Sequence, residues 1–256
     1  MMQENAVLGC KLSKSLSFSQ DEELYIATTD TKIKMEEDYA PFVDKILNNI
    51  SYIPNKILDL GCGPGYIARR ISEILPDSFV FGVDKSITMI NHAFKVFKKR
   101  MQIDYAVSSA YKINNAAFTI FRNGAGYPNY CNFRLKYIIA DSASLPFGNF
   151  DFDLIILKGT FKCLDDKLNS LKEMHRVLSH GGEIFIYEFR KDIPEDEFNM
   201  LTKKMNPQKV KSLRRKLNCS LDIPEYKKYL FEAGLSGFSV IEPDGLDLRI
   251  RISKNC

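Results

Sequence analysis

Short apolar runs alternate with longer stretches of helical periodicity through the middle of the chain. Apolar runs of strand length occur at 56–60, 79–83, 137–140, 152–157 and 183–188. Amphipathic spacing predicts helices between them, at 66–75, 87–100 and 168–178. This alternation is typical of an α/β fold in which most strands of one sheet are parallel.

Outside this middle region the pattern changes. Residues 1–20 have little periodicity and are predicted to form a flexible lead-in, whereas 21–49 has the spacing of one or two helices. A break is expected near 39–41, because Pro41 can open a helix at its first turn.

The C-terminal part is predicted to contain two helices, a basic amphipathic one over 196–217 and a shorter one over 225–233. Two final strands, near 237–242 and 246–252, flank a Pro-Asp-Gly turn signal at 243–245. The sheet is therefore expected to end in an antiparallel hairpin.

Length and composition narrow the class of protein. The chain has 256 residues, enough for one large α/β domain, and its net charge of +4 does not by itself argue for a nucleic-acid partner. Six scattered cysteines form no CxxC pair and no zinc-like spacing, so no metal site is expected and a reducing, cytoplasmic location is favoured. No apolar run approaches the roughly 18 residues that a membrane span needs.

The segment 59–65, with the sequence DLGCGPG, lies between a predicted strand and a predicted helix. Its three glycines allow a sharp turn and a close approach of the backbone to a ligand, and the following helix offers unpaired N–H groups. Dinucleotide-binding loops share these features, but here the spacing is GxGxG and Asp59 precedes the first glycine. A carboxylate at that position can hold an ammonium group.

Two further acids stand at predicted strand ends. Asp84 ends the second strand and can accept both hydroxyls of a ribose, although it also has the position of a helix cap, for which Ser86 competes. Asp141 ends the third strand and is followed by Ser142; together they can meet the amine and a ring nitrogen of adenine. Carboxyl ends of parallel strands form the ligand crevice of such sheets.

These segments, in this order, resemble class I S-adenosylmethionine-dependent methyltransferases. The resemblance runs from KILDLGCGPG through VFGVDKS, IIADSASLPF and FDFDLIIL to LKEMHRVLSHGGEIFIYEF, over about residues 55–190, and is strongest to the ubiquinone/menaquinone-biosynthesis type. It implies a Rossmann-like, doubly wound sheet of seven strands with the last one antiparallel. Residues 1–50 would then be a lead-in with cap helices, and 51–256 the cofactor-binding domain.

The resemblance also implies a ligand, S-adenosyl-L-methionine, which would leave as S-adenosyl-L-homocysteine. Asp59 and the 61–65 loop would hold the methionine part, Asp84 the ribose, and Asp141 with Ser142 the adenine. The full expected cofactor set is Asp59, Gly61, Cys62, Gly63, Gly65, Asp84, Lys85, Asp141, Ser142 and Leu157.

The chain departs from the family pattern in two places. Fifty-seven positions separate Asp84 from Asp141, and the extra material around 103–135 is rich in Tyr and Phe. It can be interpreted as a substrate cap, a dimer contact or a tolerated surface insertion. After the fourth strand the chain reads LKGTFKC, where relatives often have paired histidines, so the usual general base is in doubt.

Methyl transfer mainly requires alignment of the acceptor and exclusion of water, and a base only when the acceptor holds its proton. Glu188, at the end of the fifth strand, is the candidate base, with a structural role as the alternative. Phe161 and Arg190 are candidate acceptor contacts; Arg190 and Lys191 suit a carboxylate or a phosphate.

The sequence therefore favours an enzyme that methylates a small molecule at oxygen, nitrogen or carbon. One alternative is an RNA or protein methyltransferase, for which the basic stretch 203–216 would supply a phosphate-facing helix. Another is a module that binds S-adenosylmethionine without turnover. The identity of the acceptor and the oligomeric state have no signal in the sequence.

Overall fold

The computed structural model describes residues 22, 23, 25–27, 34–101, 105–113, 116–123 and 134–255, and between 98 and 133 it describes the backbone alone. The lead-in expected at 1–20 and the aromatic side chains of the 103–135 insertion lie outside the described residues. None of the helices in these ranges is long and apolar enough to cross a membrane.

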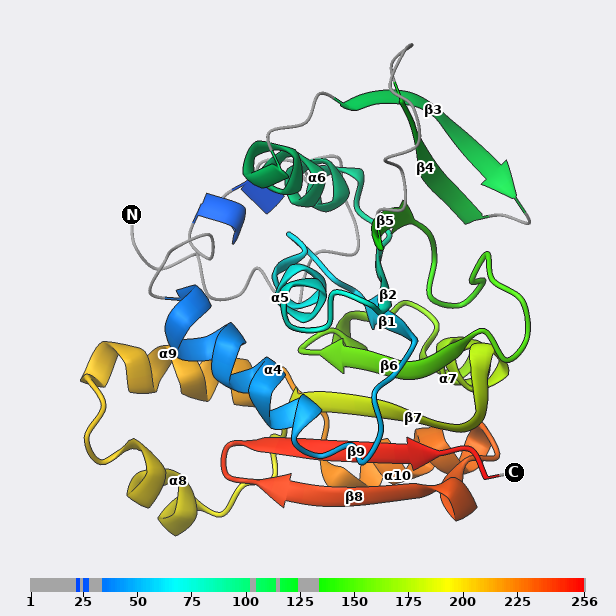
Figure 1. Ribbon diagram of the computed structural model, residues 1–256. Coiled ribbons are helices and arrows are strands. Elements are labelled where there is room, and N and C mark those ends of the chain that lie inside the picture. Colours follow the sequence, from blue (N-terminus) through cyan, green and yellow to red (C-terminus); the bar gives the residue numbers. More distant parts are fainter. Residues whose placement is uncertain are drawn as a thin grey trace.

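A seven-stranded mixed sheet forms the centre of the fold (Figure 1). Its strands are β1 (Lys56–Leu60), β2 (Phe79–Asp84), β5 (Leu135–Ile139), β6 (Phe152–Lys158), β7 (Leu178–Phe189), β8 (Ser239–Asp244) and β9 (Asp247–Ser253). They lie in the order β5-β2-β1-β6-β7-β9-β8. The first five pair in parallel, and β9 is antiparallel to both of its neighbours. This confirms the doubly wound α/β fold with an antiparallel last strand.

Helices cover both faces of the sheet (Figure 1). The face with α4 (Ala40–Leu47), α5 (Tyr66–Ile74) and α6 (Ile87–Met101) forms one core cluster, and the face with α7 (Lys167–Val177) and α10 (Ile223–Glu232) forms the other. The remaining helical elements are η1 (Met35–Tyr39), η2 (Phe161–Cys163), α8 (Glu195–Thr202), α9 (Pro207–Asn218) and η3 (Ser236–Phe238).

The central strands are apolar at successive positions because both of their faces are covered. On β6, Leu154 and Ile156 belong to the core on the α5 side, whereas Ile155 and Leu157 belong to the core on the α7 side. All four side chains have no exposed surface. A strand buried on both faces reads as a continuous apolar run, which explains why its position was predictable.

One predicted element is wrong. The structure divides the expected helix 196–217 into α8 and α9, with a break at 203–206. Pro207 has no N–H to donate to a preceding turn, and the Asn206 side chain accepts a hydrogen bond from the Gln208 N–H (2.8 Å), which starts a new helix. The helical spacing continued across this cap and concealed it.

The insertion contains a separate two-stranded antiparallel sheet. It consists of β3 (Tyr105–Ile113) and β4 (Ala116–Asn123), which pair with each other, and it lies next to β5 of the main sheet (Figure 1). The extra residues around 103–135 were recognised from the sequence, but their hairpin was not predicted.

Candidate functional site

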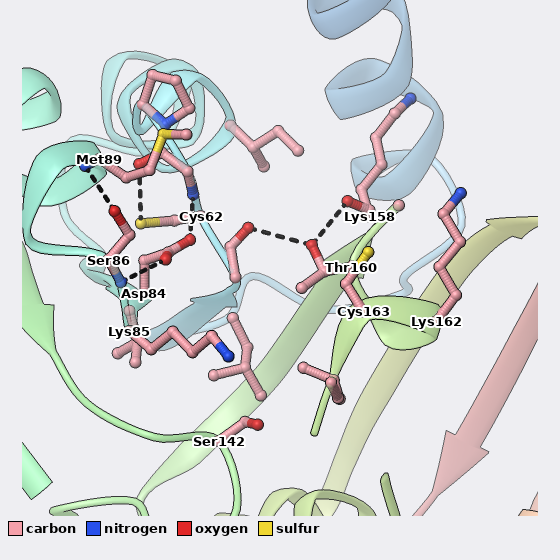
Figure 2. A pocket seen from close by; sticks show the side chains of 18 of the residues that line it. Cys62, Asp84, Lys85, Ser86, Met89, Ser142, Lys158, Thr160, Lys162 and Cys163 are labelled. Carbon is pink, nitrogen blue, oxygen red and sulfur yellow. Dashed lines mark hydrogen bonds between the residues drawn. The ribbon is translucent and has the colours of Figure 1, made fainter. Parts of the chain in front are cut away.

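A cavity of about 670 Å³ lies at the carboxyl ends of the parallel strands. The order of the strands reverses between β1 and β6, which is where ligands bind in open α/β sheets. Its walls include the loop after β1, the end of β2, the turn after β5 and the segment after β6, shown in Figure 2. Tyr39, at the end of η1, closes part of the cavity from the N-terminal side.

The glycine loop after β1 has the conformation that its sequence predicts. Gly61, Gly63 and Gly65 have φ values of 69°, 52° and 77°, a region that side chains disfavour. A Cβ on Gly61 would lie 2.2 Å from Cγ2 of Thr160, whereas nothing lies within 4 Å of a Cβ built on Gly63. The loop is therefore held tightly at Gly61 and leaves open space beside Gly63.

Tyr137 of β5 packs against this loop, a contact that was not predicted from the sequence. Its hydroxyl donates a hydrogen bond to the Gly65 carbonyl (3.0 Å), and the ring would lie 2.6 Å from a Cβ on Gly65 and 2.7 Å from one on Gly82. Two glycines thus make room for one fully buried ring. The alternating burial of β5 marks Tyr137 as an inward residue, but no motif pointed to its contact with the loop.

Asp84 connects the end of β2 to the glycine loop. Its Oδ2 accepts the Gly63 N–H (2.8 Å) and its Oδ1 accepts the Ser86 N–H (2.9 Å). Ser86, in turn, caps the first turn of α6 by accepting the Met89 N–H (3.1 Å). Burial raises the pKa of Asp84, and the two N–H groups oppose that rise. Because Ser86 performs the capping, the Asp84 carboxylate is left at the cavity wall.

Asp59 lies behind the loop and does not line the cavity. Its side chain is 1% exposed, and its Oδ2 accepts the Ala68 N–H at the start of α5 (3.0 Å). Burial raises the pKa of Asp59 to about 7; the Ala68 N–H lowers it and the neighbouring Asp84 raises it further. A carboxylate in this position would be stabilised by a cation.

Cys62, Lys85, Asp141 and Ser142, four members of the expected cofactor set, line the cavity. The Asp141 Oδ1 accepts the Ala143 N–H (2.8 Å), and the Ser142 hydroxyl lies 2.7 Å from that of Ser170. Lys85 forms an ion pair with Asp165 across the mouth (2.5 Å).

Three other candidates lie behind the cavity wall. Leu157 is fully buried in the core, and Phe161 packs its ring against Tyr226 (5.7 Å between centroids). Arg190 is buried and pairs with Glu197 (3.1 Å). Residues of strand β6 and its extension that do reach the cavity are Lys158, Gly159 and Thr160.

Glu188, the candidate base, is also buried behind the wall. Its Oε1 accepts the Phe161 N–H (2.5 Å), and its Oε2 lies 3.7 Å from Nζ of Lys162. Burial raises the pKa of Glu188 to about 7, whereas Lys162 and the Phe161 N–H lower it. The carboxylate therefore anchors the turn η2.

The cavity also contains side chains that no sequence motif indicated. They come from the end of β6, from η1, η2, α5 and α9: Tyr39, Tyr66, Lys158, Thr160, Lys162 and Lys216. Only the tertiary fold brings these elements together. Within the described residues, no group of three or more His, Cys, Asp or Glu side chains could hold a metal ion.

Comparison with known proteins agrees with this geometry. Residues 58–186, half of the chain, match the family model described as a methyltransferase domain. The ubiquinone/menaquinone biosynthesis C-methyltransferase of Coxiella burnetii is 32% identical over 136 residues, which cover 53% of this chain and 43% of that protein. An uncharacterized methyltransferase of Schizosaccharomyces pombe is 29% identical over 130 residues, 51% of this chain and 38% of that protein. The matches therefore span less than half the length of these relatives.

Solved structures share the fold over nearly the whole chain. An S-adenosyl-L-methionine-dependent methyltransferase described as putative, from Methanococcus maripaludis, superposes with a TM-score of 0.64 at 18% identity and covers 95% of this chain and 96% of its own. The plantazolicin methyltransferase BpumL, in complex with a monoazolic desmethylPZN analog and SAH, gives 0.63 at 14% identity, with 99% and 97% covered.

The strand order, the glycine loop and the family match lead to one assignment. The chain belongs to the methyltransferase-domain family, has the fold of S-adenosyl-L-methionine-dependent methyltransferases, and is similar over about half of its length to ubiquinone/menaquinone biosynthesis C-methyltransferases.

Proposed function

We propose that this protein transfers a methyl group from S-adenosylmethionine to a small-molecule acceptor. The observation that carries this proposal is the cavity at the point where strand order reverses, with the open glycine loop and Asp84 on one wall. The family match supports the cofactor and the type of reaction.

The described residues suit the chemistry of that cofactor. Asp84 offers a carboxylate to the ribose hydroxyls, while the open side of Gly63 allows close approach of the methionine part. Asp59 lies behind the loop, so it would act on the methionine part indirectly, by holding the start of α5 through the Ala68 N–H. Asp141 and Ser142 stand where the adenine would lie, and their backbone is fixed by the turn at Ala143.

The remaining members of the expected set receive supporting roles. Gly65 and Cys62 shape the loop, and Lys85 with Asp165 closes the mouth beside the proposed ribose site. Leu157 belongs to the core on the α7 side and has no exposed surface, so its contribution is to packing.

The cofactor supplies a methyl group on a sulfonium, which reacts by in-line displacement. The task of this chain is to align the acceptor and to exclude water, which the buried walls of the cavity favour. Glu188 supports the reaction indirectly: by accepting the Phe161 N–H it holds η2, and with it Lys162, at the cavity. A general base is required only for an acceptor that keeps its proton at neutral pH.

A small acceptor fits the described surface better than an RNA. The basic stretch 203–216 begins in the break after α8 and continues in α9, and its Arg214 is turned toward α8, where it pairs with Glu195 (2.5 Å) and stacks over Phe198. The relatives point the same way by name, since one acts in quinone biosynthesis and another was solved with a desmethylPZN analog.

The test is methyl transfer from S-adenosylmethionine carrying a tritiated methyl group. The purified protein would be incubated with the low-molecular-weight, RNA and protein fractions of a cell extract. We expect label to enter the low-molecular-weight fraction, and to be reduced to background with Asp84→Ala. Label in RNA or protein instead would overturn the small-molecule acceptor; tight cofactor binding without label in any fraction would indicate a binding module.

A further inference from the structure

Three of the lysines that line the cavity come from β6, η2 and α9. Lys158 ends β6, Lys162 lies in η2, and Lys216 lies in the last turn of α9. Figure 2 shows Lys158 and Lys162 together, across the cavity from Asp84 and Ser86. Lys158 and Lys162 therefore lie on the other side of the cavity from the Asp84 carboxylate.

Two of these lysines have no carboxylate close by. Within the described part of the chain, no Asp or Glu oxygen lies within 4 Å of Nζ of Lys158 or Lys216. The Lys158 ammonium instead lies 3.7 Å from the centre of the Phe42 ring. Lys162 has Glu188 at 3.7 Å. This end of the cavity thus holds more positive side chains than it has close acidic partners.

Acids farther away are largely occupied by other cations. Asp38 pairs with Lys34 (2.5 Å), and Asp244 pairs with Lys45. Asp247 is electrostatically coupled to Lys158 and Lys162, and burial raises its pKa to about 6. Burial is also the main reason for the lowered pKa of Lys158. An anion placed beside Lys158 would offset the cost of burying that cation.

Four other cationic residues near the site have partners of their own. Lys85 pairs with Asp165 (2.5 Å), and Lys167 donates to the Leu164 carbonyl (2.8 Å). Arg190 and Lys191, which the sequence suggested for an acceptor anion, pair with Glu197 (3.1 Å) and Glu225 (2.6 Å). Among the described lysines that line the cavity, Lys158, Lys162 and Lys216 are therefore those whose ammonium groups have no hydrogen-bond partner.

Aromatic rings line the same cavity. The rings of Tyr39 and Tyr66 stand 5.0 Å apart, and the Lys162 ammonium lies 5.4 Å from the centre of the Phe189 ring. Such rings favour a flat apolar body, while the lysines favour a negative group on it.

We propose that the methyl acceptor is an aromatic small molecule carrying a carboxylate or a phosphate, and that Lys158, Lys162 and Lys216 bind this anionic group. The inference rests on the proposed function, because it takes the glycine-loop end of the cavity as the cofactor site.

The test uses calorimetric titration of the protein saturated with S-adenosylhomocysteine. The probes are benzoate, phenyl phosphate and neutral benzamide, so the arms separate a carboxylate from a phosphate and both from an uncharged ring. We expect one of the anions to bind and benzamide to bind at least tenfold more weakly. Lys216→Gln and Lys158→Gln should each lower the affinity for the anion about tenfold, since each removes a charged partner. Lys211→Gln, on an exposed part of α9 outside the cavity, should bind it like the wild type.

The affinity for S-adenosylhomocysteine separates the two proposals. Suppose that every variant retains its affinity for S-adenosylhomocysteine. The anionic acceptor is then refuted, and the cofactor site stands, in any of three cases: benzamide binds as tightly as the anions, neither anion binds, or the lysine variants bind the anion with wild-type affinity. If S-adenosylhomocysteine does not bind the wild type, the proposed function itself fails.

Discussion

Asp59→Asn should stabilise the protein in the absence of cofactor. The carboxyl is 1% exposed, and no cation pairs with it among the described residues. Asparagine keeps an oxygen that can accept the Ala68 N–H, which Asp59 accepts at 3.0 Å. The substitution therefore removes a buried negative charge with little change of shape.

The magnitude follows from the pKa. Folding raises the pKa of Asp59 from 3.8 to about 7, so the native state binds more protons than the unfolded state between these values. Stability contributed by this group consequently falls as the pH rises from about 4 to about 7. The buried Asp59 carboxyl therefore lowers the free energy of unfolding by about 4 kcal/mol at pH 8 and by about 2 kcal/mol at pH 5.

Urea unfolding without cofactor, at pH 5 and at pH 8, measures this difference. We expect the free energy of unfolding of Asp59→Asn to exceed that of the wild type by about 4 kcal/mol at pH 8. At pH 5 this difference should be smaller by about 2–3 kcal/mol. Asp77→Asn is the control, because the Asp77 side chain is 97% exposed. A gap that does not change with pH would refute the reasoning, since it would mean that Asp59 titrates as it does in the unfolded chain.

Three other substitutions test the packing around the site, and Gly234→Ala serves as a control for the first of them. Gly65→Ala should lower the free energy of unfolding by about 2–4 kcal/mol, because the new Cβ meets Tyr137 at 2.6 Å in a left-handed conformation. Gly234 has a φ of 74° with open space around it, so Gly234→Ala should lower the free energy of unfolding by only about 1 kcal/mol. Equal losses for Gly65→Ala and Gly234→Ala in urea unfolding would contradict the contact between Gly65 and Tyr137. Tyr137→Phe removes the hydrogen bond to the Gly65 carbonyl and should lower Tm by about 2–4 °C in scanning calorimetry; an unchanged Tm would argue against that bond. Leu157→Ala should cost about 2–5 kcal/mol in urea unfolding yet leave the calorimetric Kd for S-adenosylhomocysteine unchanged, and a weaker Kd would show that Leu157 contacts the cofactor.

Local patterns predicted the sheet well, since strands buried on both faces leave unbroken apolar runs. They also located the acids at strand ends, because topology places the ends of parallel strands at one edge. Asp84 and Asp141 line the cavity for this reason. Helix ends were less predictable: the cap at Asn206 sits inside an unbroken amphipathic pattern, and the single helix expected there was wrong.

Contacts between distant elements had no local signal. Tyr137 contacts Gly65 although 72 positions separate them, and Lys216 of α9 lines the same cavity as Lys158 of β6. Glu188 was recognised as standing at a strand end, but the direction of its side chain depends on the Phe161 N–H, which no spacing reveals. Such residues become identifiable only from the fold.

The most direct measurement of the central claim is calorimetric titration with S-adenosylmethionine, S-adenosylhomocysteine and NAD, on the wild type and on Asp84→Ala. Asp84 stands at the cavity wall, and each charge-assisted hydrogen bond to a ribose hydroxyl contributes about 1.5–3 kcal/mol. We predict binding of both adenosyl compounds to the wild type, no binding of NAD, and at least a tenfold loss of affinity in Asp84→Ala. If neither adenosyl compound bound, or if Asp84→Ala bound them as tightly as the wild type, the cofactor site described above would be contradicted.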